Sequence, residues 1–363
     1  MPATLEIWNH LQRRFFPVPM EEVGSLTAKD NQFVEVMGLL PLGPFLEPYR
    51  WVGTGCPPHE RDWLLHAFIA KAVYEFPTTR ALLEALAARP TLRRLCGWES
   101  AGEVPHESTF SRAFAAFAQD ELPQKIHAAL VCRQRGQRLV GHVRRDATAM
   151  DACEKAAAKP AVAPKAPAKR GRPVKGQERP PAPPKRVDLQ AGRTLAENLA
   201  DLPTACAVGC KRNSKGHQEC WIGCKLHVDT IDGDIPVSAL LTSASVHDSQ
   251  VAIPLAQMTA QRMTSLYDLM DSAYDAPQIH EFSRRLGPVP IIDPNPRRGE
   301  KIPLAPAPAQ RFKQRNASER VNSLLKERYG GRFVRVRGAR KVMAHLMFGL
   351  IALTALPLYQ LIL

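Results

Sequence analysis

Acidic residues are in short supply in this chain of 363 residues: 35 Asp and Glu stand against 49 Lys and Arg, giving a net charge of +14. The excess is gathered in two segments, residues 151–190 with ten basic against four acidic residues and residues 297–341 with fourteen against three. The rest of the chain is slightly acidic. Contiguous phosphates need contiguous cations. Charge gathered in two segments is therefore stronger evidence for a polyanion partner than a uniformly basic composition would be.

The N-terminus lacks the basic start and the apolar run of a signal peptide, so we expect a cytoplasmic protein. In that compartment the eight cysteines are expected to be reduced thiols rather than a disulfide framework. One set, Cys206-x3-Cys210-x9-Cys220-x3-Cys224, has the residue type that binds structural zinc. We do not favour zinc there, because the spacing is looser than in zinc knuckles and Cys220 and Cys224 fall in a predicted strand.

Long apolar runs are also rare. Residues 346–363 have the length of a membrane span, but Thr354, Pro357 and Gln360 interrupt the run, and no second segment of this kind exists. We therefore expect no membrane association. Residues 344–363 are predicted to form a buried helix that closes a core.

Residues 1–135 have helical apolar spacing and predict an all-α N-terminal domain. We expect this domain to serve DNA binding or dimerisation. Helices are expected over residues 62–74 and 79–88, and a third begins at Ser108. Arg112 and other arginines near helix ends are placed to dock on a duplex, as in helix-turn-helix modules. Because no recognition helix stands out, a plain helical bundle is an equal alternative.

The chain changes character after the helical region. Residues 137–150 begin a second domain with a predicted strand that ends at Asp146, and residues 151–200 are a basic insertion rich in Ala, Pro and Lys. This composition cannot bury a core, so we expect the insertion to be disordered. Within it, Lys169, Arg170 and Arg172 resemble the AT-hook, which lies in narrow minor grooves. A solvated, charged linker is the alternative.

Residues 201–343 alternate between strand and helix patterns. The sequence Asp232-Gly233-Asp234 favours a hairpin turn between two strands, and Asp248 is expected to cap a helix that runs to about Met263. The predicted strands cover residues 219–229, 235–243, 264–270 and 289–293, and further helices cover residues 276–286 and 311–328. Hairpins mixed with crossover connections imply an α/β domain of three layers with a mixed sheet.

The helix predicted over residues 311–328 carries an unusual polar stripe. With about 100° of rotation per residue, six residues fall on one side: Phe312, Arg315, Glu319, Asn322, Ser323 and Lys326. Three aliphatic residues fall on the opposite side: Val321, Leu324 and Leu325. Such a helix aims one carboxylate, flanked by cations, at an anion or a metal. An amphipathic surface helix with solvated salt bridges has the same spacing.

Two aspartates are expected at the ends of strands, Asp146 after the first strand and Asp271 after the strand over residues 264–270. Carboxylates in such places emerge at one edge of an open sheet. If they face each other, they repel unless a divalent cation lies between them. Together with Glu319 they suit two hard ions such as Mg²⁺ or Mn²⁺. Other aspartates compete for these roles: Asp151, Asp268 and Asp275.

Phosphoryl transfer is the reaction typical of two such ions, one activating the nucleophile and the other stabilising the leaving oxygen. The protein then contributes only the positions and charges of its side chains, so the reaction needs no histidine or cysteine nucleophile. Three cations on the helix are candidate contacts to flanking DNA phosphates: Arg315, Arg320 and Lys326. Lys225 and His227 are weaker candidates, since surface strand positions are their simpler interpretation.

The string Phe312-x2-Arg315-x3-Glu319-x6-Lys326 resembles the Tyr-x2-Arg-x3-Glu-x6-Lys signature of bacterial insertion-sequence transposases of the DDE class. Three further stretches look like motifs of that family: residues 221–227, 246–249 and 271–275. Residues 61–96 and 105–112 are similar to its helical N-terminal domain. The resemblance covers most of the chain outside the insertion. It departs from the family where Phe312 replaces tyrosine and removes a hydroxyl.

The resemblance implies a ribonuclease H-like mixed sheet flanked by helices, with Asp146, Asp271 and Glu319 as catalytic and metal-binding residues. It also implies double-stranded DNA as partner: terminal inverted repeats and target DNA, cleaved and joined in a synaptic homodimer. One rival is a nuclease of the same fold that cuts without joining. Another is a DNA-binding protein that descends from a transposase, against which the presence of all three acids argues.

Overall fold

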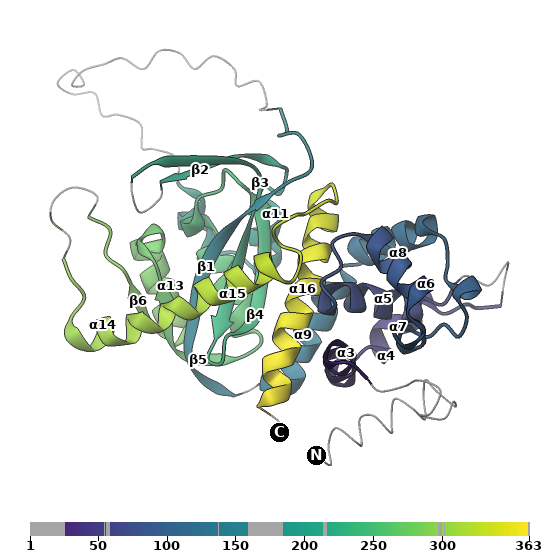
Figure 1. Ribbon diagram of the computed structural model, residues 1–363. Helices are drawn as coiled ribbons and strands as arrows, with labels where there is room; N and C mark the ends of the chain where they lie inside the picture. The colour runs from purple at the N-terminus through teal and green to yellow at the C-terminus, as the bar shows by residue number, and fades with distance from the viewer. Residues whose placement is uncertain are drawn as a thin grey trace.

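The structure, a computed structural model, describes residues 26–53, 55, 59–136, 138–158, 184–212, 216–296, 300 and 302–361. Figure 1 shows helices from the first part of the chain beside a sheet that is flanked by further helices. The AT-hook-like residues Lys169, Arg170 and Arg172 lie outside the described residues.

The described residues from 26 to 136 are mostly helical, as predicted. Its elements are α3 Ala28–Leu39, α4 Gly43–Leu46, η1 Glu47–Tyr49, α5 Arg61–Val73, α6 Thr79–Ala88, α7 Pro90–Cys96, η2 Ala101–Glu103, α8 Glu107–Gln119 and α9 Leu122–Arg135. Thr78 caps α6 by accepting a hydrogen bond from the Ala81 amide. Phe68 packs edge-on against Phe110 and Phe117, which joins α5 to α8.

The second part contains a mixed sheet, which confirms the predicted α/β class. The strands are β1 Leu139–Asp151, β2 Ala207–Arg212, β3 Gln218–Ile231, β4 Ile235–Ser243, β5 Thr264–Met270 and β6 Val289–Ile292. β1 lies between β3, to which it is antiparallel, and β5, to which it is parallel. β6 continues the parallel side, whereas β4 and β2 both pair antiparallel with β3.

The first strand is longer than predicted. β1 continues past Asp146 to Asp151, so the prediction that Asp146 ends the strand is wrong. The physical reason is the second partner: β1 pairs with β5 only as far as Arg145 and Met270, but pairs with the long β3 as far as Asp151. Asp146 is therefore the first residue of β1 beyond its parallel neighbour.

Helices cover both faces of the sheet. They are α10 Arg186–Gln190, α11 Leu195–Asp201, η3 Asp248–Gln250, α12 Ala252–Ala260, η4 Ser272–Tyr274, α13 Pro277–Leu286, α14 Pro306–Phe312, η5 Lys313–Arg315, α15 Asn316–Glu327 and α16 Ala339–Gln360. On one face α12 and α13 share a core with Met270 and Ile292. On the other, α15 and α16 share a core with Leu226 and Val228.

The predicted disorder of residues 151–200 is wrong for the end of that segment, where α10 and α11 form. Thr194 and Glu197 make a reciprocal capping box that begins α11. Val187 of α10 is buried in the core that it shares with α12 and α13. Local capping and this burial supply the order that the average composition of the segment did not indicate.

The apolar C-terminal segment is a buried helix, as predicted, although it begins at Ala339, directly after Gly338 at φ +84°. Among the described residues, α16 is long and apolar enough to cross a membrane, but 78% of its most apolar 18-residue window is buried in the structure. It packs against α5, α8 and α9 of the helical part and against β4 of the sheet. Phe348 stacks on Phe68 at 5.7 Å between ring centroids. This helix therefore joins the two parts of the chain.

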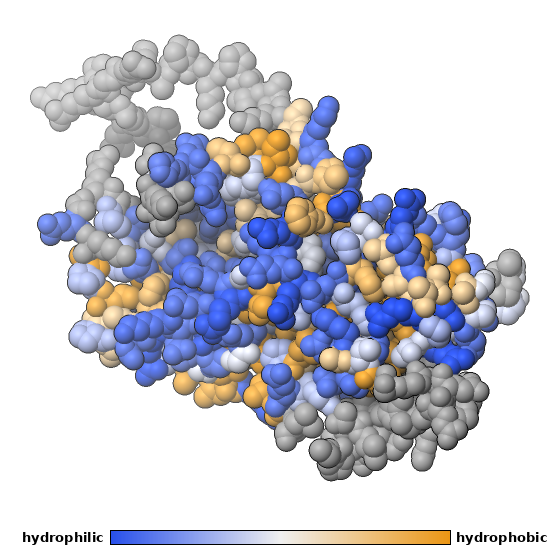
Figure 2. Space-filling model, viewed as in Figure 1, coloured by the Kyte–Doolittle hydropathy of each residue, from blue (hydrophilic) through white to orange (hydrophobic). Residues whose placement is uncertain are grey.

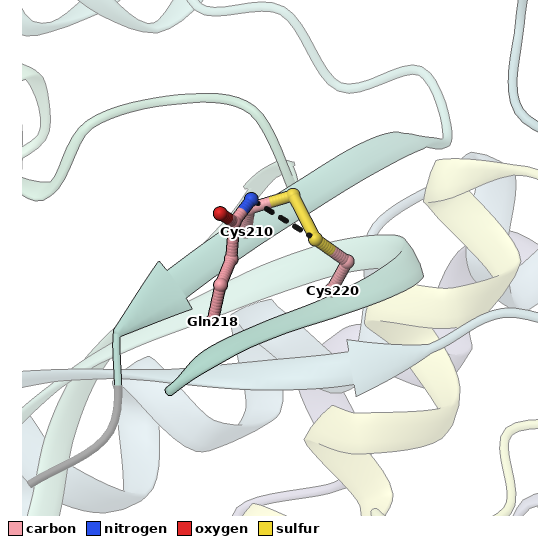
Figure 3. Close-up of a disulfide and its surroundings, with 3 residues drawn as sticks. All are labelled: Cys210, Gln218 and Cys220. Atoms are coloured by element: carbon pink, nitrogen blue, oxygen red, sulfur yellow. Dashed lines mark hydrogen bonds between the residues drawn. A yellow bond between two sulfur atoms is a disulfide. The ribbon is translucent and has the colours of Figure 1, made fainter. Parts of the chain in front are cut away.

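One pair of cysteines departs from the expectation of reduced thiols. Cys210 and Cys220 face each other across the antiparallel β2–β3 pair and form a disulfide (Figure 3). Their cross-strand positions bring the two sulfurs together, which the spacing alone did not reveal. Since these two sulfurs are bonded to each other, they are not free to join Cys206 and Cys224 in a zinc site.

Candidate active site

Three carboxylates converge where β1 and β5 part. Arg145 and Met270 are the last paired residues of these parallel strands, so Asp146 and Asp271 follow at the same edge of the sheet. Glu319 lies in the first turn of α15, which packs across β1 and β3. The structure thus brings together the three acids that the sequence predicted.

A single guanidinium connects the three acids. Nη2 of Arg315 lies 3.2 Å from Oδ1 of Asp146 and 3.5 Å from Oδ2 of Asp271, and Nη1 lies 2.9 Å from Oε1 of Glu319. Arg315 and Asp146 are largely buried, whereas the Glu319 side chain is 60% exposed. The predicted phosphate contact therefore lies among the carboxylates, as their counter-charge.

Burial raises the pKa of Asp146 to about 6, although the Arg315 guanidinium lowers it; the charges of Asp271 and Glu319 raise it further. The pKa of Asp271 is also raised, chiefly by burial and against the effect of Arg315. Burial disfavours the charged form of Arg315, but the three neighbouring carboxylates outweigh it, so its pKa is raised. The site concentrates negative charge that a cation has to balance.

Asn322 contributes a contact that sequence reasoning missed. Its Nδ2 donates to Oδ2 of Asp146 at 3.0 Å, while Arg315 holds the other oxygen of that carboxylate. The Asn322 Oδ1 atom is buried and has no hydrogen-bond partner in the described structure. Asn322 lies one turn after Glu319, so the helical stripe was the available indication, but its partner on β1 was not predictable.

The donor chemistry of this cluster fits a hard divalent cation. Carboxylate and amide oxygens are the ligands that Mg²⁺ and Mn²⁺ prefer, and the unpartnered Asn322 oxygen adds one beside Asp146. Within the described ranges, however, no three His, Cys, Asp or Glu side chains are close enough to hold a metal ion together. Arg315 lies between the acids, so they can share a metal only if its guanidinium moves aside.

The other predicted DNA contacts have different surroundings. Lys326 is half-buried, and its pKa is lowered by burial and by the nearby Lys211, against the effect of Asp151. Arg112 is exposed on α8 and donates to Oγ1 of Thr109 at 3.3 Å.

Arg320, the remaining candidate DNA contact on α15, pairs with an aspartate in a turn of the sheet. Its Nε and Nη2 donate to the two carboxylate oxygens of Asp234, at 2.8 and 2.9 Å, in the β3–β4 turn. The predicted phosphate contact is therefore already engaged in a bidentate ion pair.

The weaker candidates form a separate polar group. Nζ of Lys225 donates to Asp248 at 2.8 Å, so this aspartate pairs with a lysine and does not cap a helix as predicted. His227 is fully buried and bonds to Thr242 at 2.9 Å. The interpretation of His227 as a surface strand residue is wrong. β3 lies inside the sheet, paired with β1 and with β4, and α12 packs on its face.

Both parts of the chain match known protein families. Residues 21–116 match the family described as Transposase domain (DUF772), and residues 203–355 match the Transposase DDE domain. No curated protein and no solved structure matches the chain. The second match includes Asp271 and Glu319, and its ribonuclease H-like fold agrees with the mixed sheet described above. The chain belongs to the insertion-sequence DDE transposases.

Proposed function

We propose that this transposase binds the terminal inverted repeats of its element and cuts and joins double-stranded DNA with Asp146, Asp271 and Glu319. The observation that carries the proposal is the convergence of these acids, from β1, the end of β5 and α15, on one guanidinium. Carboxylates gathered in this way, with Asp146 largely buried, need a cation, and DNA strand transfer by a two-metal site uses such a set.

The three acids, with Asn322 beside them, would hold two Mg²⁺ or Mn²⁺ ions. When bound, such ions lower the pKa of a water or a 3′-hydroxyl and stabilise the leaving oxygen. The chain's own share is placement: strand backbone fixes the two aspartates, and the Asn322 amide orients Asp146. Arg315, once released from the acids, and Lys326 would bind the phosphates beside the scissile bond.

Charge around the site supports a DNA track. Residues 297–341, which include α14 and α15, carry the larger of the two basic clusters. Figure 2 shows mostly hydrophilic side chains over the face that α15 crosses. Arg112 and the basic residues Lys169, Arg170 and Arg172 remain further proposed contacts. Because strand transfer requires both ends of an element at once, we also propose a homodimer in the synaptic complex.

The test is a reaction of the purified full chain with Mg²⁺ and a duplex that carries the element's own ends. We expect cleavage that leaves 3′-OH ends, followed by products in which those ends are joined to a target duplex. A reaction with EDTA serves as the control.

The alternatives predict other products. Cleavage without joining at any target concentration would support a nuclease of the same fold. Binding to the ends without cleavage in Mg²⁺ or Mn²⁺ would support a DNA-binding descendant. Either result would overturn the proposed reaction.

A further inference from the structure

The turn between β3 and β4 makes two arginine–aspartate pairs that reach the active-site helix. It consists of Asp232, Gly233 and Asp234, with φ values of +84° at Gly233 and +57° at Asp234. Left-handed conformations of this kind suit a tight hairpin turn. The turn therefore presents two carboxylates from a rigid position at the end of two long, paired strands.

The first pair holds the segment just before Arg315. Arg144, on β1, donates from Nη2 to Oδ1 of Asp232 at 2.7 Å and from Nε to the Gln314 carbonyl at 2.6 Å. Its side chain is 4% exposed. Asp232 also accepts a hydrogen bond from the His142 amide. A buried guanidinium thus ties β1, the turn and the backbone of η5 together.

The second pair holds the segment just after Glu319. Arg320 makes its two hydrogen bonds to Asp234 in the parallel, bidentate arrangement. The two pairs therefore bracket residues 315–319, the stretch that carries both the bridging Arg315 and the third acid.

We propose that these two pairs form a turn clamp, Asp232–Arg144 and Asp234–Arg320, which positions Arg315 and Glu319 over Asp146. Arg320 is then a positioning residue and not a DNA contact. The inference rests on the proposed function of the same site. Because the acids come from three separate elements, a shift of about 1 Å in α15 would lower the rate by about a hundredfold.

A charge swap tests the exposed pair. The variants are Arg320→Asp, Asp234→Arg and the double variant, assayed with Mg²⁺ on the duplex that carries the element's ends. We expect each single variant to cleave up to about fivefold more slowly, since exposed pairs are worth up to about 1 kcal/mol, with DNA affinity nearly unchanged. The double variant should recover. Lys313→Asp makes the same charge change on η5, and adding Asp234→Arg should not rescue it.

A DNA contact at Arg320 predicts a different pattern. Affinity would then fall, the salt dependence would lose about one phosphate contact, and the double variant would not recover. That result would overturn the clamp.

A second readout does not depend on activity. Hydrogen exchange of the α15 amides should be faster in each single variant and in Asp232→Asn, and normal in the charge-swapped double variant. If the wild-type protein fails to cleave but this exchange pattern holds, the proposed function fails and the clamp stands. Unchanged exchange in all variants would refute the clamp itself.

Discussion

At the residue scale, Asp146 occupies a place that disfavours its own charge. Burial raises its pKa from 3.8 to about 6, so between these values the folded chain binds a proton that the unfolded chain releases. The stability that this carboxyl contributes is therefore complete below about pH 4 and is lost as the pH rises through about 6.

The Asp146→Asn variant should lack this dependence on pH. Measured by urea unfolding in the presence of EDTA, its unfolding free energy relative to wild type should rise by up to about 3 kcal/mol between pH 4 and pH 7, from about 1.4 kcal/mol per pKa unit. A difference that stays constant over this range would show that the carboxyl is not perturbed.

Asn322 should matter through its hydrogen bond to Asp146. Asn322→Leu keeps the approximate shape but removes the donor, and hydrogen bonds to charged groups are worth about 1.5–3 kcal/mol. We expect single-turnover cleavage to be about tenfold to a hundredfold slower. Ser323→Ala, at the exposed neighbouring position, is the control, and equal rates in both variants would argue against the role of Asn322.

At the scale of elements, α15 owes its position to a narrow apolar side. Val321 and Leu325 are fully buried, whereas Leu324, predicted to lie with them, is 37% exposed. The segment predicted as one helix over residues 311–328 is divided by η5, so the buried apolar face of α15 consists of Ala317 and those two residues.

Leu325→Ala should therefore lower the unfolding free energy by about 2–5 kcal/mol, because it empties a site in the core under α15. Leu324→Ala makes the same chemical change one residue earlier and should cost about 1 kcal/mol or less. Chemical denaturation of both variants provides the comparison. Equal losses would mean that α15 is not packed as described.

Sequence reasoning identified the elements whose patterns are local. The strand at residues 264–270 and the helix at 79–88 match β5 and α6 because apolar periodicity and capping mark their limits. The end of β1 was missed, since it depends on how far β3 extends. The convergence of Asp146, Asp271 and Glu319 was predictable from the expected edge of the sheet and from helical spacing, although Asp146 lies within β1 and not at its end. The partners of Asn322, Arg144 and Arg320 were not, because each crosses between elements far apart in the chain.

At the scale of the whole molecule, α16 shares one core with the helical part and another with the sheet. Most of the excess positive charge lies elsewhere, in the two basic segments, residues 151–190 and 297–341. DNA affinity and fold stability should therefore respond to different sets of substitutions.

Replacing Lys169, Arg170 and Arg172 by alanine tests the first basic segment. If all three contact phosphates, the slope of log affinity against log salt concentration should become shallower by up to about 2.7, from about 0.9 per phosphate. Thermal unfolding should stay unchanged. An unaltered slope would favour the solvated linker.

The most direct measurement of the central claim is single-turnover cleavage of the element's ends in Mg²⁺ by triad variants. Asp146→Asn, Asp271→Asn and Glu319→Gln should each lose at least about a hundredfold in rate while binding the ends normally. Two matched controls, Asp151→Asn on the same strand and Glu327→Gln on the same helix, should cleave like wild type. Wild-type rates in any of the three triad variants would contradict the account.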